Sequence, residues 1–123
     1  MTTPKRMLVI DDNQELLAGL KTYFSKKSFE VLGAFDGLEG LKLLEAEEGK
    51  FDVVITDIVM PNVSGVGIIA ILKNRYPDTP VIAITGMGEH PETLAREANA
   101  DLVVEKPFDL PELEKKILSL IKK

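Results

Sequence analysis

The segment Met7-Leu8-Val9-Ile10-Asp11-Asp12 indicates what kind of fold this chain adopts. Four consecutive apolar residues followed by two carboxylates are typical of a β-strand that is covered on both faces and ends in a polar loop. Similar short runs occur at Val53-Val54-Ile55, at Val81-Ile82-Ala83-Ile84 and at Leu102-Val103-Val104. The run from Phe29 to Ala34 contains a glutamate and predicts an edge strand. The chain therefore has five candidate strands.

Helical patterns lie between these runs. Apolar residues recur at helical spacing in three segments, namely Leu16, Leu17, Leu20 and Phe24, then Leu38, Leu41 and Leu44, and finally Leu110, Leu113, Ile117 and Leu120. Asp36 is placed to cap the second of these helices, Pro91 predicts the first turn of another, and Asn99 predicts its left-handed end. This alternation predicts an α/β protein with a parallel sheet and helices on both faces.

The composition excludes several classes of protein. With 123 residues, 45% of them apolar and 28% charged, the chain is expected to form one globular domain. A net charge of −5 disfavours binding to nucleic acid or to anionic lipid. The absence of cysteine excludes thiol nucleophiles and cysteine metal sites, and the one histidine, His90, excludes multi-histidine sites. No apolar stretch is long enough to span a membrane, so a cytoplasmic location is predicted.

Polar residues follow the predicted strands at the point where each one ends, the edge at which parallel α/β sheets bind ligands. They are Asp11 and Asp12, Asp57, Thr85, and Lys106 followed by Pro107. Three clustered carboxylates predict a hard divalent cation, and Mg²⁺ fits best. With an ammonium and a hydroxyl beside them, they indicate phosphoryl transfer with Asp57 as the nucleophile. Each residue taken singly is commonly structural, and either Asp12 or Asn13 could cap a helix, but the set is hard to explain in that way.

The motifs resemble those of a known family. They are Leu8-Val9-Ile10-Asp11-Asp12, Asp57-Ile58-Val59-Met60-Pro61 with Ser64-Gly65, Ile84-Thr85-Gly86, and Lys106-Pro107-Phe108. The sequence resembles a response-regulator receiver domain of two-component signalling, of the single-domain kind found in chemotaxis regulators. The resemblance runs from about Met7 to Leu120, so residues 1–123 are expected to form one receiver domain. It implies a doubly wound, flavodoxin-like (βα)5 fold with a five-stranded parallel sheet in the order 2-1-3-4-5.

The resemblance also implies a role for each site residue. Asp57 would accept a phosphoryl group from a histidine kinase or a histidine phosphotransfer protein. Asp12, Asp57 and the backbone carbonyl of Val59 would bind Mg²⁺, with Asp11 acting largely through water. Thr85 and Lys106 would contact the phosphoryl oxygens. The bond between Lys106 and Pro107 would be cis.

As a receiver, the chain is expected to be a binding switch rather than an enzyme, although it would assist its own phosphorylation and dephosphorylation. Its other partner would be a downstream effector or an output domain. Many receivers carry an aromatic residue two or three positions before the lysine, where this chain has Val103 and Val104. Valine is stiff, so two interpretations stay open: the switch relies on backbone and helix movement, or the site is weakly coupled to output. One face of a further predicted helix is formed by Gly65, Ile69, Leu72 and Tyr76. Ile71 lies off that face, which is consistent with a dimer or partner surface or with a scattered surface residue.

Other interpretations remain open. The chain could be a receiver from a longer regulator, such as a transcriptional one, or a receiver-like scaffold that works without phosphorylation. A flavin carrier is disfavoured, because the loops after the strands offer acids where flavin phosphate needs amides and hydroxyls. The segment from Gly65 to Ala70 matches the glycine pattern of a dinucleotide-binding loop. No acid ends the next predicted strand, so that interpretation is rejected. His90 is interpreted as a residue at the start of a helix rather than a phosphorelay site.

Overall fold

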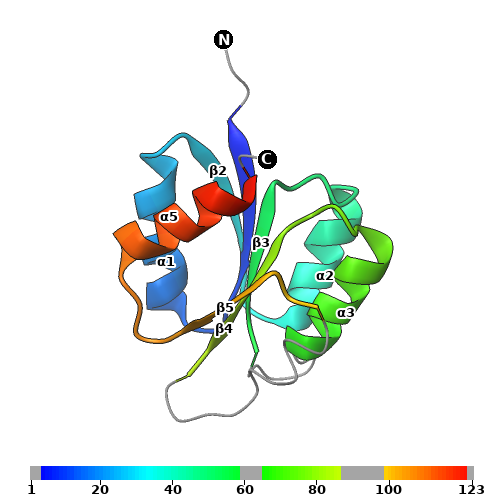
Figure 1. Cartoon of the computed structure of the whole chain (residues 1–123). Coiled ribbons are helices and arrows are strands. Elements are labelled where there is room, and N and C mark those ends of the chain that lie inside the picture. Colours follow the sequence, from blue (N-terminus) through cyan, green and yellow to red (C-terminus); the bar gives the residue numbers. More distant parts are fainter. Residues whose placement is uncertain (1–3, 59–64, 87–98, 122–123) are drawn as a thin grey trace.

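The computed structural model describes residues 4–58, 65–86 and 99–121 (Figure 1). The strands are β1 (Lys5–Ile10), β2 (Phe29–Ala34), β3 (Val53–Asp57), β4 (Val81–Thr85) and β5 (Leu102–Glu105). The helices are α1 (Gln14–Ser25), α2 (Gly37–Ala46), α3 (Gly65–Arg75) and α5 (Leu110–Ile121). The helix predicted from Pro91 lies outside the described residues, but Asn99 has the predicted left-handed conformation, with φ of 73°.

All strand pairs in the sheet are parallel, and the strand order is β2-β1-β3-β4-β5. In Figure 1, α1 and α5 lie on one face of the sheet, and α2 and α3 lie on the other. This arrangement confirms the predicted doubly wound fold and its strand order. It also confirms β2 as an edge strand, on which Glu30 is exposed.

The core consists of two apolar layers, one on each face of the sheet. Phe24, Leu113 and Ile117 belong to the layer under α1 and α5, whereas Ile69 and Leu72 belong to the layer under α3. Every residue of β3 and of β4 is buried, which explains why these strands read as continuous apolar runs. Burying one large aliphatic side chain stabilises a fold by about 1.5–3 kcal/mol, so these layers account for much of the folding free energy.

Side-chain caps mark the starts of α1 and α2. The side chain of Asn13 accepts a hydrogen bond from the Leu16 amide at 3.1 Å, and that of Asp36 accepts one from the Glu39 amide at 2.8 Å. The predicted cap at Asp36 is therefore confirmed. Of the two candidates for capping α1, Asn13 is the one that does so, which leaves Asp12 available for another role.

Leu38 belongs to the predicted apolar stripe of α2 but does not face the core. Its side chain is 49% exposed, and the buried positions of α2 are Gly37, Gly40 and Leu44. The helix approaches the sheet so closely that a Cβ at Gly40 would lie 2.5 Å from Cδ1 of Ile10. Because the glycines take the contact face, the leucine stripe turns partly toward solvent.

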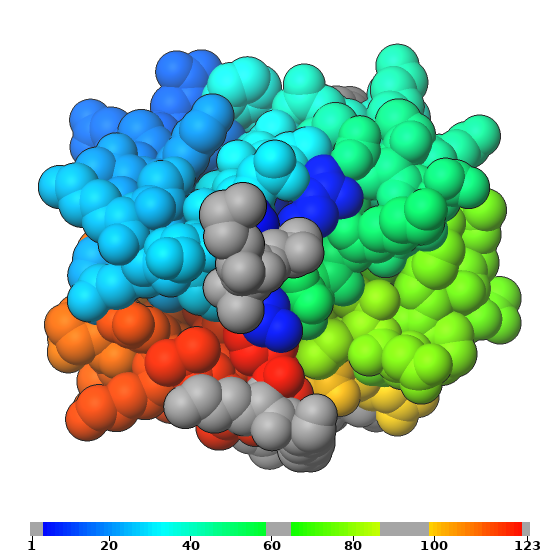
Figure 2. Space-filling model, turned by 90° about the horizontal axis from the view of Figure 1, so that it is seen from above, coloured from blue at the N-terminus to red at the C-terminus, as the bar shows by residue number. Residues whose placement is uncertain are grey.

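Arg6 links several segments at the amino-terminal end of the sheet. Figure 2 shows this end from above, with the start of β1 in blue and α5 in red. Its guanidinium forms ion pairs of 2.6 Å with Glu30 on β2 and with Glu47 after α2. The same group lies 4.9 Å from the ring centre of Phe51. These contacts join β1, β2 and the segment before β3.

Among the described residues, no helix has both the length and the apolar character needed to cross a membrane.

Gly65 and Gly19 offer a matched test of how closely α3 packs. A Cβ at Gly65 would lie 2.7 Å from Cα of Ile58 and would also meet the Asp57 carbonyl oxygen, whereas a Cβ at Gly19 meets no atom within 4 Å. We expect Gly65→Ala to lower the free energy of unfolding by about 1–3 kcal/mol through overpacking. Gly19→Ala should raise it by up to about 1 kcal/mol through helix propensity. Urea unfolding followed by circular dichroism measures both, and equal midpoints for the two variants would contradict this packing.

Candidate functional site at the carboxyl end of the sheet

The register of the strands places the predicted site residues at one edge. Ile10 pairs with Ala34 and with Thr56, so the carboxylates after β1 lie beside the end of β3. Asp57 pairs with Ile84, and Thr85 pairs with Glu105 immediately before Lys106. Residues that are far apart in the sequence therefore meet at one edge because the strands are parallel.

Asp11, Asp12 and Asp57 form a compact acidic cluster. Each contributes one carboxylate oxygen to a set whose members all lie within 4.8 Å of one another. Asp11 is completely buried and Asp57 is 5% exposed, while Asp12 is exposed. Buried like charges at this distance repel one another, so the cluster favours a cation.

The ammonium group of Lys106 lies against the two buried acids. Its Nζ atom is 3.2 Å from Oδ2 of Asp57, to which it donates a hydrogen bond, and 3.3 Å from Oδ2 of Asp11. Burial of Lys106 lowers its pKa, but the charges of Asp11 and Asp57 outweigh that effect, and the pKa is raised above its ordinary value. Lys106 is therefore held as a cation at the acidic cluster.

The residues present fit a hard divalent cation. Oδ1 of Asp11 accepts a hydrogen bond from the Asn13 amide at 2.8 Å, and the buried Oδ2 is 3.3 Å from the ammonium group that it shares with Asp57. The single charge of Lys106 neutralises at most one of the three carboxylates. Oxygen ligands with excess negative charge are the donor set that Mg²⁺ prefers. The cluster therefore suits Mg²⁺ chemically.

Thr85 and the residues around Lys106 complete this edge. Thr85 is 2% exposed, and its carbonyl oxygen accepts a hydrogen bond from the Lys106 amide at 2.7 Å. The bond between Lys106 and Pro107 is cis, as the resemblance implied. Val103 is half-buried and Val104 is 5% exposed, next to Ala83 and Ile84 of β4. Val59 lies outside the described residues.

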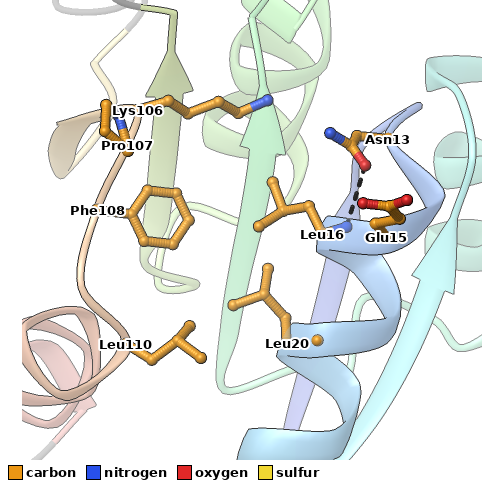
Figure 3. Close-up of a pocket in the computed structure, with 9 residues that line it drawn as sticks. Asn13, Glu15, Leu16, Leu20, Lys106, Pro107, Phe108 and Leu110 are labelled. Carbon is orange, nitrogen blue, oxygen red and sulfur yellow. Dashed lines mark hydrogen bonds between the residues drawn. The ribbon is translucent and has the colours of Figure 1, made fainter.

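An apolar groove opens beside the acidic cluster (Figure 3). Its cavity has a volume of about 570 Å³ between the start of α1 and the loop that precedes α5. In Figure 3, Leu16 and Leu20 face Phe108 and Leu110, and the side chain of Lys106 crosses one end. The groove thus adjoins the side chain that contacts Asp57.

Sequence reasoning did not single out this groove or Thr56. The groove forms from segments that are distant in the chain, so no local pattern reveals it. Thr56 is completely buried next to Asp57, and its hydroxyl donates a hydrogen bond of 3.0 Å to the Asp57 carbonyl oxygen. Its signal was a threonine that interrupts the apolar run Val53-Val54-Ile55 directly before the central acid.

Comparisons with known proteins agree with this geometry. A family model described as the response regulator receiver domain matches residues 7–118. The chain belongs to this family. The transcriptional regulatory protein PrrA of Mycobacterium bovis is 34% identical over 122 residues, which make up 98% of this receiver and 52% of PrrA. The receiver thus spans about half the length of the curated relatives it matches.

Solved structures of receivers have the same fold. A response regulator receiver domain protein from Clostridium thermocellum is 34% identical, with a TM-score of 0.88 and coverage of 96% of this chain and 94% of that one. The response regulator TrrA from Thermotoga maritima, solved in complex with Mg²⁺–BeF, is 33% identical. Its TM-score is 0.82, with coverage of 94% and 98%. The resemblance seen in the sequence motifs is therefore confirmed at the level of family and fold.

The raised pKa of Lys106 gives a pH-dependent prediction. Its stabilising contribution is fully present below about pH 10.5, its ordinary pKa, and is lost as the pH rises through the higher folded-state pKa. In a ¹³C NMR titration of the lysine Cε signals, we expect the Lys106 midpoint to lie above 10.5 and to fall in Asp57→Asn. Lys106→Gln assigns the signal. A Lys106 midpoint that Asp57→Asn leaves unchanged would contradict the contact.

Proposed function

We propose that this receiver is a phosphorylation switch in which Asp57 accepts a phosphoryl group from a phosphohistidine. The observation that supports this most strongly is the buried carboxylate of Asp57, 3.2 Å from the ammonium of Lys106 and beside two further acids. Such a carboxylate is a nucleophile, and Lys106 supplies one cation of the kind that phosphoryl transfer requires.

In the proposed reaction, a carboxylate oxygen of Asp57 attacks phosphorus. An O–P bond forms as the P–N bond of the phosphohistidine breaks, and the leaving imidazole nitrogen keeps the electron pair of that bond and takes up a proton from water. Lys106 would neutralise charge on one phosphoryl oxygen, and the Thr85 hydroxyl would donate a hydrogen bond to another. Bound Mg²⁺ would neutralise further charge, held by Asp12, Asp57 and the Val59 carbonyl, with Asp11 acting through water.

Phosphorylation would act on the rest of the molecule through charge. It adds about −1.5 to −2 charges and three acceptor oxygens at Asp57. In the unphosphorylated chain Lys106 contacts Asp11 and Asp57, and on phosphorylation it would shift toward the phosphoryl group. Thr85 would turn its hydroxyl toward the same group. Since positions 103 and 104 are both valine, the change would reach partners through the backbone of β4 and β5 rather than through an aromatic side chain.

This function implies two kinds of partner. The donor would be a sensor histidine kinase or a histidine phosphotransfer protein, and the recipient of the signal would be an effector protein, an output domain or a second receiver in a phosphorylation-dependent homodimer. We place the receiver in the cytoplasm, with residues 1–123 forming one receiver domain. It would assist its own phosphorylation and dephosphorylation without acting on a metabolite.

The apolar groove beside Lys106 is a suitable docking surface for the phosphodonor. A donor protein must bring its phosphohistidine to the edge of the sheet that carries Asp57. The groove is lined by Leu16, Leu20, Phe108 and Leu110, and Lys106 lies at its end (Figure 3). Apolar side chains that flank the phosphohistidine on a donor helix could fill it while the phosphoryl group reaches Asp57.

Leu16→Arg tests the groove. We expect phosphorylation by a histidine kinase that phosphorylates the wild-type chain to fall on the order of tenfold, because a buried apolar contact is replaced by a charge. Phosphorylation by acetyl phosphate should stay within about twofold, since a small donor needs no groove. Leu38→Arg makes the same change on α2, away from the groove, and should affect neither rate. Equal kinase rates for the two variants would show that the donor docks elsewhere.

Intact mass tests the phosphoacceptor. After incubation with Mg²⁺ and acetyl phosphate, we expect the wild-type chain to gain one phosphoryl group that hydroxylamine removes. Asp57→Asn should gain none, because an amide is not a nucleophile at this position. Asp78→Asn, which changes an exposed aspartate far from the cluster, should behave as wild type. A chelator should abolish the gain. A folded wild-type chain that gains no mass at saturating Mg²⁺ would favour a phosphorylation-independent scaffold.

A further inference from the structure

Thr56 is a buried hydroxyl that the proposed reaction does not yet use. It occupies β3 between Ile10 of β1 and Ala83 of β4 and has no exposed surface. Its neighbours at positions 54 and 58 belong to the apolar layer under α3. Valine has nearly the same shape and suits a buried strand better, whereas a hydroxyl at such a position needs a hydrogen-bond partner.

The partner of this hydroxyl is the backbone of the phosphoacceptor. Oγ1 of Thr56 donates a hydrogen bond of 3.0 Å to the carbonyl oxygen of Asp57. The start of α3 packs on the same peptide, since a Cβ at Gly65 would overlap the Asp57 carbonyl and come within 2.7 Å of Cα of Ile58. The Ile58 amide donates to the Ile84 carbonyl at 3.0 Å, and the Gly65 amide donates to the Ile58 carbonyl at 3.0 Å. The peptide after Asp57 is thus held by β4, by α3 and by Thr56.

We infer that Thr56 is a positioning residue for phosphoryl transfer at Asp57. Its hydroxyl holds the peptide between Asp57 and Ile58 in one orientation. That orientation sets where β3 ends, and with it the position of the Asp57 carboxylate relative to Lys106. Small errors in the position of a reacting group are costly in rate, so this contact raises the rate constant of the folded protein. The inference rests on the proposed function.

The test compares Thr56→Val with Thr56→Ser. Valine keeps the shape and removes the hydroxyl, whereas serine keeps the hydroxyl and removes the methyl group. With acetyl phosphate and Mg²⁺ both saturating, we expect Thr56→Val to be phosphorylated on the order of tenfold more slowly than wild type. Thr56→Ser should stay within about twofold of wild type. Thr79→Val is the matched control, because Thr79 is also buried but lies at the other end of the sheet, before β4.

A second readout separates positioning from stability. Rates are measured well below each variant's unfolding temperature, with folding checked by circular dichroism, so a merely structural role would lower the unfolding temperature and leave the rate unchanged. The Mg²⁺ concentration that gives half the maximal rate should also be higher in Thr56→Val than in wild type, and it should have the wild-type value in Thr56→Ser. If valine disturbs packing, Thr56→Ala replaces it, because alanine also removes the hydroxyl and should slow phosphorylation in the same way.

The outcomes are distinct from those of the proposed function. If the wild-type chain is phosphorylated and Thr56→Val reacts at the same rate, or Thr56→Ser is as slow as Thr56→Val, the positioning role is overturned and the switch stands. A wild-type chain that takes up no phosphoryl group overturns the proposed function, and this inference with it.

Discussion

The rest of the site depends on one interaction, the contact of the Lys106 ammonium group with the buried carboxylates of Asp11 and Asp57. Buried carboxylates are costly unless they are paired, and the parallel register brings these two to one edge of the sheet. Lys106 directly follows β5, which lies two strands away from β3, so the ion pair joins the central strands of the sheet to its edge. A change of charge at Asp57 therefore acts directly on the connection between β5 and α5.

The acidic cluster lies outside the apolar layers that supply most of the burial in this fold. Two apolar layers and the Arg6 contacts at the amino-terminal end support the sheet, and neither includes the acidic cluster. An excess of negative charge, from three clustered carboxylates beside one ammonium group, can therefore persist at the carboxyl end without loss of the fold. Functional sites commonly contain charged groups in unfavourable electrostatic environments.

Much of the architecture was predictable from local patterns. Short apolar runs that alternate with helical spacing identify parallel strands buried on both faces, and the polar residues at their ends identify the site. The prediction failed where packing distance overrides periodicity. Leu38 fits the leucine stripe, but Gly40 lets α2 approach Ile10 closely, and the helix turns that leucine toward solvent. A periodic pattern gives the face of a helix but not how near it lies to a sheet.

The sequence was sufficient to predict that one edge of the sheet carries Asp11, Asp12, Asp57, Thr85 and Lys106, because parallel strands necessarily end at a common edge. It could not reveal that Asn13 caps α1, that Lys106 lies nearly equidistant from Asp11 and Asp57, or that Leu16 and Phe108 face each other across a groove. It also gave no role to Thr56. These features depend on distances between segments remote in the chain, or on where one hydroxyl points, and such distances exist only once the helices have packed on the sheet.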